Sequence, residues 1–379
     1  MKNRISLRLL LPASVIFLVA LLPGCGIFGG SDKKPKPLPD IAAPFPAKVV
    51  WQASVTKSDG FAFTPAASQG VVYAAGADGT IVGTGDGTGR VESRINAGQK
   101  LSGGVGYGDG KIVVGTAKGE VLAFESSGRA LWKSPVGGEV LAAPTVTTNF
   151  VLARTADGRI FALNTLDGRR RWVYQRAPPA LTLRSSAGVV VSRGTVYAGF
   201  AGGKLVALEL ESGKPIWEAT LSQPRGATEL ERIADIGGLP VLDDTRICAS
   251  VYQGRSGCVE TLNGNVLWSR ELSSASGFSV DSRNVYLSDD AGNVHALSKL
   301  TGASVWKQDQ LVKRRLGAPV LFADKVWVGD ANGLVHILSS DNGALIGRVP
   351  TDGSAINAMI TIDGLVVAQT ARGGVFAIR

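Results

Sequence analysis

The stretch Gly203-Lys-Leu-Val-Ala-Leu-Glu-Leu-Glu-Ser-Gly213-Lys-Pro-Ile-Trp217 decides the fold of this 379-residue chain. A glycine opens a short apolar segment, a second glycine closes it, and a tryptophan follows soon after. The opening glycine recurs at intervals of about 40 residues, and its positions are Gly79, Gly119, Gly158, Gly203, Gly254, Gly292, Gly333 and Gly373. Short strands joined by glycine turns at this period predict propeller blades of four strands each.

One complete repeat shows how a blade is expected to form. The strands expected within residues 188–221 are 189–191, 195–199, 204–210 and 215–219, which are rich in β-branched and apolar residues. The tryptophan on the fourth strand should pack between neighbouring blades, because each blade must bury its faces against the next. Ser93 and Gly347 take the place of this tryptophan in two repeats.

The two ends of the repeat array predict how the ring closes. The chain stops after the third strand of the last repeat, Gly373-Gly-Val-Phe-Ala-Ile378, and therefore lacks a fourth strand there. Lys48-Val-Val-Trp51-Gln-Ala-Ser54 reads as a fourth strand without a blade of its own. Pairing the two removes an exposed sheet edge. We therefore expect an all-β, eight-bladed β-propeller over residues 48–379, with N-to-C closure of the last blade.

Charge and composition narrow the function classes. The formal net charge is +9, and charged residues make up only 19% of the chain. Part of the positive excess lies before residue 49, and the remainder is too diffuse to indicate a nucleic acid-binding surface. Many glycines with few charges suit tight turns between half-buried strands.

The first 24 residues read as a targeting segment. Lys2, Arg4 and Arg8 precede an apolar run that is too short for a comfortable membrane span. The run ends in Leu22-Pro23-Gly24-Cys25, which resembles a bacterial lipobox and implies lipidation of Cys25. The alternative is an ordinary signal peptide with an incidental cysteine. Gly26, where such lipoproteins carry Asp for inner-membrane retention, favours the outer membrane.

A proline-rich segment follows the predicted lipidation site. Its prolines are Pro35, Pro37, Pro39, Pro44 and Pro46. Such a composition favours an extended, solvated chain. Residues 25–47 are therefore expected to act as a tether between a membrane and the propeller.

Cys248 and Cys258 lie on either side of one predicted turn in the fifth repeat. The loop length decides whether they face each other or point to opposite faces of the sheet. A disulfide and a pair of small apolar strand residues are both compatible with the sequence, and the choice stays open. A metal site is not indicated, because no histidine or third cysteine lies nearby.

The two longest intervals between repeats indicate where a binding surface lies. Their extra residues fall at 175–187 and 220–239, after successive blades, so both should emerge side by side on one face. Long ordered loops on a rigid scaffold usually carry binding. Leu181, Leu183 and Arg184 suit a protein interface, where apolar anchors and arginine dominate. The alternative is that both leucines fold back onto the propeller.

The phrase V-Y-x-G…G-x-x-x-A-L…G-x-x-x-W resembles the repeat of pyrroloquinoline-quinone dehydrogenases, which are eight-bladed propellers. The predicted lipobox, tether, repeat number and closure are similar to those of the BamB family, lipoprotein subunits of the outer-membrane β-barrel assembly (BAM) complex. That resemblance implies a non-enzymatic scaffold without a cofactor, anchored in the outer membrane and facing the periplasm. Its partners would be BamA, other subunits of the complex and unfolded β-barrel clients.

The resemblance extends to the two long loops. Leu181-Thr-Leu-Arg184 is similar to the family's Leu-x-Leu-Arg segment, which implies that Leu181, Leu183 and Arg184 contact BamA. Thr228-Glu-Leu-Glu-Arg-Ile-Ala-Asp235 resembles the family's acidic loop, which implies contacts from Arg232 and from an exposed Asp235. Gly237 stands where the family often has a second Asp.

A periplasmic quinoprotein oxidoreductase is the alternative function. It would need carboxylates for calcium and polar residues around a central cofactor. His295 and His336 occupy one repeat position that is apolar in other blades, which predicts packing rather than catalysis. The Asp-Gly pairs fit turn chemistry, so the sequence indicates no catalytic residue and no metal site.

Overall fold

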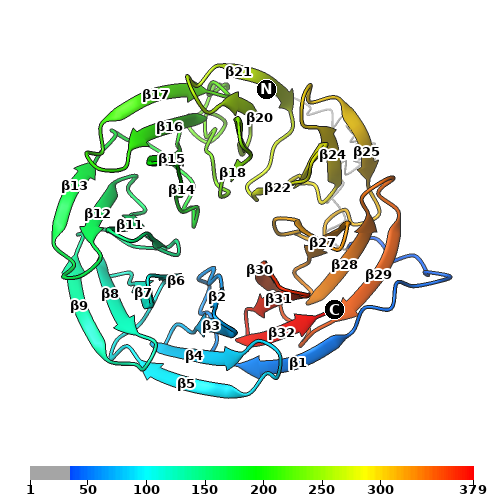
Figure 1. The fold of residues 1–379 in the computed structure, drawn as a ribbon. Helices are drawn as coiled ribbons and strands as arrows, with labels where there is room; N and C mark the ends of the chain where they lie inside the picture. The colour runs from blue at the N-terminus through cyan, green and yellow to red at the C-terminus, as the bar shows by residue number, and fades with distance from the viewer. Residues whose placement is uncertain (1–34) are drawn as a thin grey trace, which may run out of the picture. The chain divides into compact units, whose positions relative to one another are not determined.

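A computed structural model describes residues 35–379, which form one unit starting at Pro35. Every sheet has four antiparallel strands, and eight such sheets follow one another around a ring (Figure 1). The shortest strand of most blades lies toward the centre and the fourth strand lies on the rim. The predicted all-β, eight-bladed β-propeller is confirmed. In the part of the chain that the structure covers, no helix is long and apolar enough to cross a membrane.

The blades are numbered along the chain, and each is given from its innermost to its outermost strand. Blades 1 to 4 comprise β2 (Ala66–Ser68), β3 (Val71–Ala75), β4 (Thr80–Gly85) and β5 (Val91–Asn96); β6 (Gly103–Gly108), β7 (Lys111–Gly115), β8 (Glu120–Glu125) and β9 (Ala130–Pro135); β10 (Thr145–Val146), β11 (Phe150–Arg154), β12 (Ile160–Asn164) and β13 (Arg170–Tyr174); β14 (Val190–Ser192), β15 (Thr195–Phe200), β16 (Lys204–Glu209) and β17 (Pro215–Thr220).

Blades 5 to 8 comprise β18 (Val241–Leu242), β19 (Arg246–Ala249), β20 (Arg255–Glu260) and β21 (Val266–Glu271); β22 (Phe278–Val280), β23 (Asn284–Ser288), β24 (Val294–Ser298) and β25 (Ser304–Gln308); β26 (Val320–Phe322), β27 (Lys325–Gly329), β28 (Leu334–Ser339) and β29 (Leu345–Pro350); β30 (Ile356–Ile362), β31 (Leu365–Thr370), β32 (Gly374–Ile378) and β1 (Val49–Ser54). The strands expected within residues 188–221 match those of blade 4 to within one residue at each end. The core lies between the faces of neighbouring blades.

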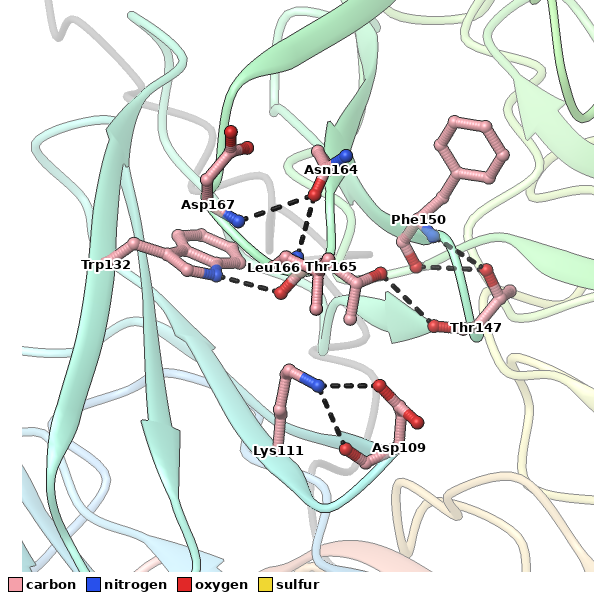
Figure 2. Close-up of polar contacts among 9 residues, drawn as sticks. All are labelled: Asp109, Lys111, Trp132, Thr147, Phe150, Asn164, Thr165, Leu166 and Asp167. Carbon is pink, nitrogen blue, oxygen red and sulfur yellow. Dashed lines mark hydrogen bonds and ion pairs between the residues drawn. The ribbon is translucent and has the colours of Figure 1, made fainter.

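In six of the eight described blades, a tryptophan on the outermost strand joins the blade to the next one, as predicted. In Figure 2, the Trp132 Nε1–H of blade 2 donates a 3.0 Å hydrogen bond to the Thr165 carbonyl in the β12–β13 turn of blade 3. The indole ring lies over Gly168 in the same turn, where an added Cβ would come within 2.5 Å of Trp132 Cε3. Gly168 also has φ of +69°. The second glycine of the repeat therefore seats the tryptophan of the preceding blade.

Ring closure also follows the prediction. Strand β1 pairs antiparallel with β32, placing Trp51 opposite Ala377 and Ala53 opposite Val375. Beyond the strands, the backbone N–H of Lys48 donates to the Arg379 carbonyl, and the Arg379 N–H donates back to Lys48. The first and last described segments of the propeller are thus paired in one sheet, which leaves blade 8 complete.

The proline-rich segment departs from the expectation of a solvated tether. The Phe45 N–H donates to the Ile346 carbonyl on β29, and Leu38 packs against the core between blades 6 and 7. The segment is extended, as proline predicts, but its described part lies along the outside of blade 7 (Figure 1). For the described residues 35–47, the expectation of a fully solvated chain is wrong, because the apolar residues between the prolines bury part of their surface. Cys25 and the predicted signal peptide lie outside the described residues.

The structure answers the question that the sequence left open about the two cysteines. Cys248 on β19 lies directly opposite Cys258 on β20, and a disulfide joins them. Both residues are buried and pack against Trp268 and Leu297. The disulfide therefore staples the middle two strands of blade 5.

Candidate protein-binding surface

The two insertions meet on one face of the propeller. Insertion A is residues 175–189, between β13 and β14, and insertion B is residues 221–240, between β17 and β18. The Leu183 N–H donates a 2.7 Å hydrogen bond to the Asp235 carboxylate, and the Ser185 hydroxyl donates to the Gly237 carbonyl. These bonds confirm that the insertions are neighbours.

Asp235 has a different role from the exposed contact that the family resemblance implied. It is only 4% exposed. Its carboxylate also accepts a 3.2 Å hydrogen bond from the Gly202 N–H in the β15–β16 turn. The side chain points inward, because there it accepts from two backbone N–H groups, one in insertion A and one in blade 4. Asp235 therefore braces the surface from beneath and does not present a free charge.

Arg154 lies under insertion A and shows how closely the insertion covers blade 3. Its guanidinium donates to the Ala187 carbonyl and stacks on Phe200 at 5.2 Å from the ring centre. Burial lowers the Arg154 pKa to about 10, and the nearby negative charge of Asp235 opposes that shift. The arginine remains protonated at neutral pH. The adjoining cavity of about 40 Å³ has room for a few waters.

The three residues predicted from insertion A differ in their surroundings. Leu181 is 43% exposed, whereas Leu183 is half-buried with its side chain close to Gly237. Arg184 is exposed, forms a 3.2 Å ion pair with Glu139 and stacks over the Phe61 ring. The alternative in which the leucines fold back therefore applies partly to Leu183 and not to Leu181.

Arg232 lies at the surface of insertion B. Its Nε–H donates to the Gly226 carbonyl, and its Nη1 lies 3.4 Å from the Glu229 carboxylate. Next to it, the Glu231 carboxylate accepts hydrogen bonds from the N–H groups of Ala227 and Thr228. Backbone donation from Thr228 is the main reason that the Glu231 pKa is lowered. Insertion B is thus ordered by its own side chains.

Two exposed leucines were not selected from the sequence. Leu230 is 67% exposed and Leu239 is 50% exposed, and both lie in insertion B. Together with Leu181 they place apolar side chains on both insertions. Leu230 could have been identified from the sequence, because it is an apolar residue inside a loop without the alternation of a strand. The contact between Arg184 and Phe61 could not have been predicted in this way, because the two residues lie far apart in the repeat array.

The two histidines are buried, as the apolar repeat position predicts, but each has an acidic partner that the pattern did not indicate. His336 Nε2 lies 3.0 Å from Asp330, and His295 Nε2 lies 2.9 Å from Asp289. Burial lowers the His336 pKa, with the Asp330 carboxylate opposing it. Within residues 35–379, no group of three or more His, Cys, Asp or Glu side chains is arranged to hold a metal ion.

Together, the repeated blades and the paired insertions define an eight-bladed β-propeller with two ordered, partly apolar loops on one face. A family profile described as "Outer membrane protein assembly factor BamB" matches residues 77–308 and 292–379. The chain belongs to this family.

Individual relatives agree with the family match. The outer membrane protein assembly factor BamB of Nitrosomonas eutropha is 45% identical over 335 residues, covering 88% of this chain and 82% of that protein. The crystal structure of BamB from Moraxella catarrhalis has a TM-score of 0.82 at 28% identity, covering 88% of this chain and 99% of that one. A quinohemoprotein alcohol dehydrogenase from Comamonas testosteroni has a TM-score of 0.72 at 14% identity, covering 88% of this chain and 76% of its own, and shares only the fold.

Proposed function

We propose that this chain is a non-enzymatic scaffold of the outer-membrane β-barrel assembly machinery, facing the periplasm. It binds BamA, and through BamA the other subunits, and assists the insertion of β-barrel proteins into the outer membrane. The observation that carries this proposal is the pair of hydrogen-bonded insertions, which presents Leu181, Leu230 and Arg184 on one face. Apolar anchors beside an arginine are typical of protein interfaces.

Lipidation at Cys25, after removal of residues 1–24, would hold the protein at the outer membrane. Replacing Cys25 by Ser behind an ordinary cleavable signal should release a folded protein into the soluble periplasmic fraction. If that variant still fractionated with outer membranes lacking BamA, a second membrane contact would exist and the proposed single anchor would be wrong.

A pull-down from solubilised outer membranes tests the proposed partner. Leu183→Ala combined with Arg184→Ala should abolish co-purification of BamA, because it removes a half-buried apolar contact and the guanidinium beside it. Lys214→Ala, in the β16–β17 turn on the opposite face, is the control and should bind normally. Normal binding by a folded double variant would place the interface elsewhere.

The competing proposal is a quinoprotein oxidoreductase, which only the shared fold favours. Adding pyrroloquinoline quinone and calcium to the purified protein, then recording the absorption spectrum and dye-linked oxidation of alcohols or sugars, separates the two functions. We expect no stoichiometric cofactor uptake and no oxidation. Stoichiometric uptake with turnover would contradict the scaffold function.

A further inference from the structure

Residues 36–47, here called the strap, are held on the propeller by two buried or half-buried arginines. Arg314 is 7% exposed, and its guanidinium pairs with Asp330 at 3.2 Å and donates a 3.0 Å hydrogen bond to the Lys36 carbonyl. Arg348 on β29 donates to the Pro39 carbonyl at 3.2 Å. Both donors are charged, which strengthens these bonds relative to neutral ones.

Arg314 lies on the connection between blades 6 and 7, residues 309–319, and its side chain points inward. Lys313 and Arg315 have φ of +65° and +52°, in the left-handed region that favours glycine, and both are exposed. Such conformations persist only where the surrounding structure holds them, and they gather at functional sites. Here they direct the middle arginine toward Asp330 and the strap, while two cations face outward.

The other end of the strap fills a gap in the repeat pattern. Gly347 stands where most blades carry the tryptophan that packs on the next blade. Phe45 of the strap packs against the core between blades 7 and 8, with its ring edge-to-face on Trp327. The Lys325 ammonium lies 4.5 Å from the centre of the Phe45 ring. Phe45 therefore supplies an aromatic ring at the junction between blades 7 and 8, where the outer strand β29 has no tryptophan.

From these contacts we propose that the strap fixes the point at which the lipid anchor leaves the propeller. The edge formed by the connection between blades 6 and 7 would then face the outer membrane. This inference rests on the proposed lipidation of Cys25. If the whole segment from Cys25 to residue 47 were free, Cys25 could lie up to about 75 Å from the propeller, at roughly 3.4 Å per residue. With the strap docked from Lys36 onward, only residues 25–35 link Cys25 to the propeller, and the greatest distance falls to about 37 Å.

The chemistry of this edge suits a lipid surface. Lys313 and Arg315 are exposed beside the docked end of the strap, with Lys36 also exposed. The acidic residues of this region are Asp309 on the same connection and Asp40 on the strap. Asp289 accepts from His295 in blade 6, Asp290 accepts from Ala275 in the connection before blade 6, and both line a pocket with Arg315. Exposed lysine and arginine near a membrane are attracted to anionic phospholipid head groups.

The test uses the full-length lipidated protein in vesicles of phosphatidylcholine and phosphatidylglycerol that carry a quencher on the head group. A fluorophore is attached to Gln310→Cys, on the connection between blades 6 and 7, or to Ala117→Cys, on the β7–β8 turn of the opposite blade. Both positions are exposed. We expect quenching several-fold stronger at position 310 than at position 117. Equal quenching at the two positions would overturn the proposal.

Two further variants separate the strap from the fold and from the anchor. Inserting ten glycine and serine residues after Ser31 leaves the strap and the propeller unchanged, and it should abolish the difference in quenching. Leu38→Ser with Phe45→Ser should do the same by releasing the strap. Persistence of the difference in the inserted variant would contradict the reach argument. Loss of vesicle binding altogether would instead show that anchoring at Cys25 had failed, and binding of BamA by the inserted variant reports separately on the scaffold function.

Discussion

The backbone N–H of Leu183 donates a 2.7 Å hydrogen bond to the carboxylate of Asp235, fifty-two residues further along the chain. This bond links the two insertions, so the surface that they form is a single ordered unit. The same carboxylate accepts from Gly202 in blade 4, which ties that unit to the propeller beneath it. A partner that docks here would therefore meet a preorganised surface, at a smaller cost in ordering loops.

Asp235→Ala should destabilise the protein as well as weaken partner binding. The change leaves two part-buried backbone N–H groups without an acceptor, and about 1–3 kcal/mol per fully buried donor sets the upper limit of the loss. Asp235→Asn should recover part of the loss, since its amide oxygen still accepts. Urea denaturation of the two variants checks this. If Asp235→Ala unfolded at the wild-type urea concentration, the carboxylate would not be a brace.

Gly168→Ala should reduce stability through the neighbouring indole. Its methyl group would come within 2.5 Å of Trp132, and an overpacked contact of this kind costs about 1–3 kcal/mol. Gly194→Ala is a matched control, because Gly194 has a similar φ of +75° but no heavy atom within 4 Å of an added Cβ. The control isolates the backbone strain. Equal losses of melting temperature in both variants would exclude a specific seat for Trp132.

The pH dependence of stability should include a contribution from His336. Burial holds its pKa in the folded state below the ordinary value of 6.5, so the folded protein binds fewer protons than the unfolded chain. The free energy of unfolding is therefore unaffected by this group well above pH 6.5 and should decrease as the pH falls through that value.

His336→Gln removes the titrating group and can still donate to Asp330. The variant should lose less stability than the wild type when the pH is lowered from about 7.5 to 5. Chemical denaturation at several pH values measures the difference. Parallel curves for the two proteins would mean that His336 does not titrate differently on folding.

The sequence predicted the architecture because its signals repeat. Gly168 and Trp132 recur in equivalent form around the ring, so one blade explains most of the others, and the pairing of β1 with β32 follows from the missing strand of the last repeat. The positions of Leu181 and Arg184 were predicted from loop length and from family resemblance. Asp235 was assigned the wrong environment, because an acidic residue in a loop does not reveal that two backbone donors surround it.

The strap shows the limit of composition as a guide. Its four prolines predict an extended chain, but solvation depends on whether Leu38 and Phe45 find apolar surface elsewhere, and that surface is formed by blades far away in sequence. The aspartate partners of the histidines were missed for a related reason. Each lies six residues before its histidine across a β-turn, and the repeat position itself is normally apolar.

The exposed leucines of the two insertions provide the most direct test of the central claim. Leu181→Ala combined with Leu230→Ala removes apolar surface from both insertions without touching the core. Truncating interface anchors typically costs about 2 kcal/mol or more in binding, roughly 30-fold in Kd. The matched control is Leu166→Ala with Leu262→Ala, because these leucines are 76% and 79% exposed on turns at the opposite face.

The decisive measurement is the Kd of each double variant for purified BamA, with the melting temperature recorded alongside. The account predicts that Leu181→Ala/Leu230→Ala weakens binding at least about 30-fold while Leu166→Ala/Leu262→Ala binds like the wild type, with both variants melting near the wild-type temperature. Wild-type affinity in the insertion variant, or an equal loss in the control, would contradict the claim that the paired insertions form the BamA-binding surface.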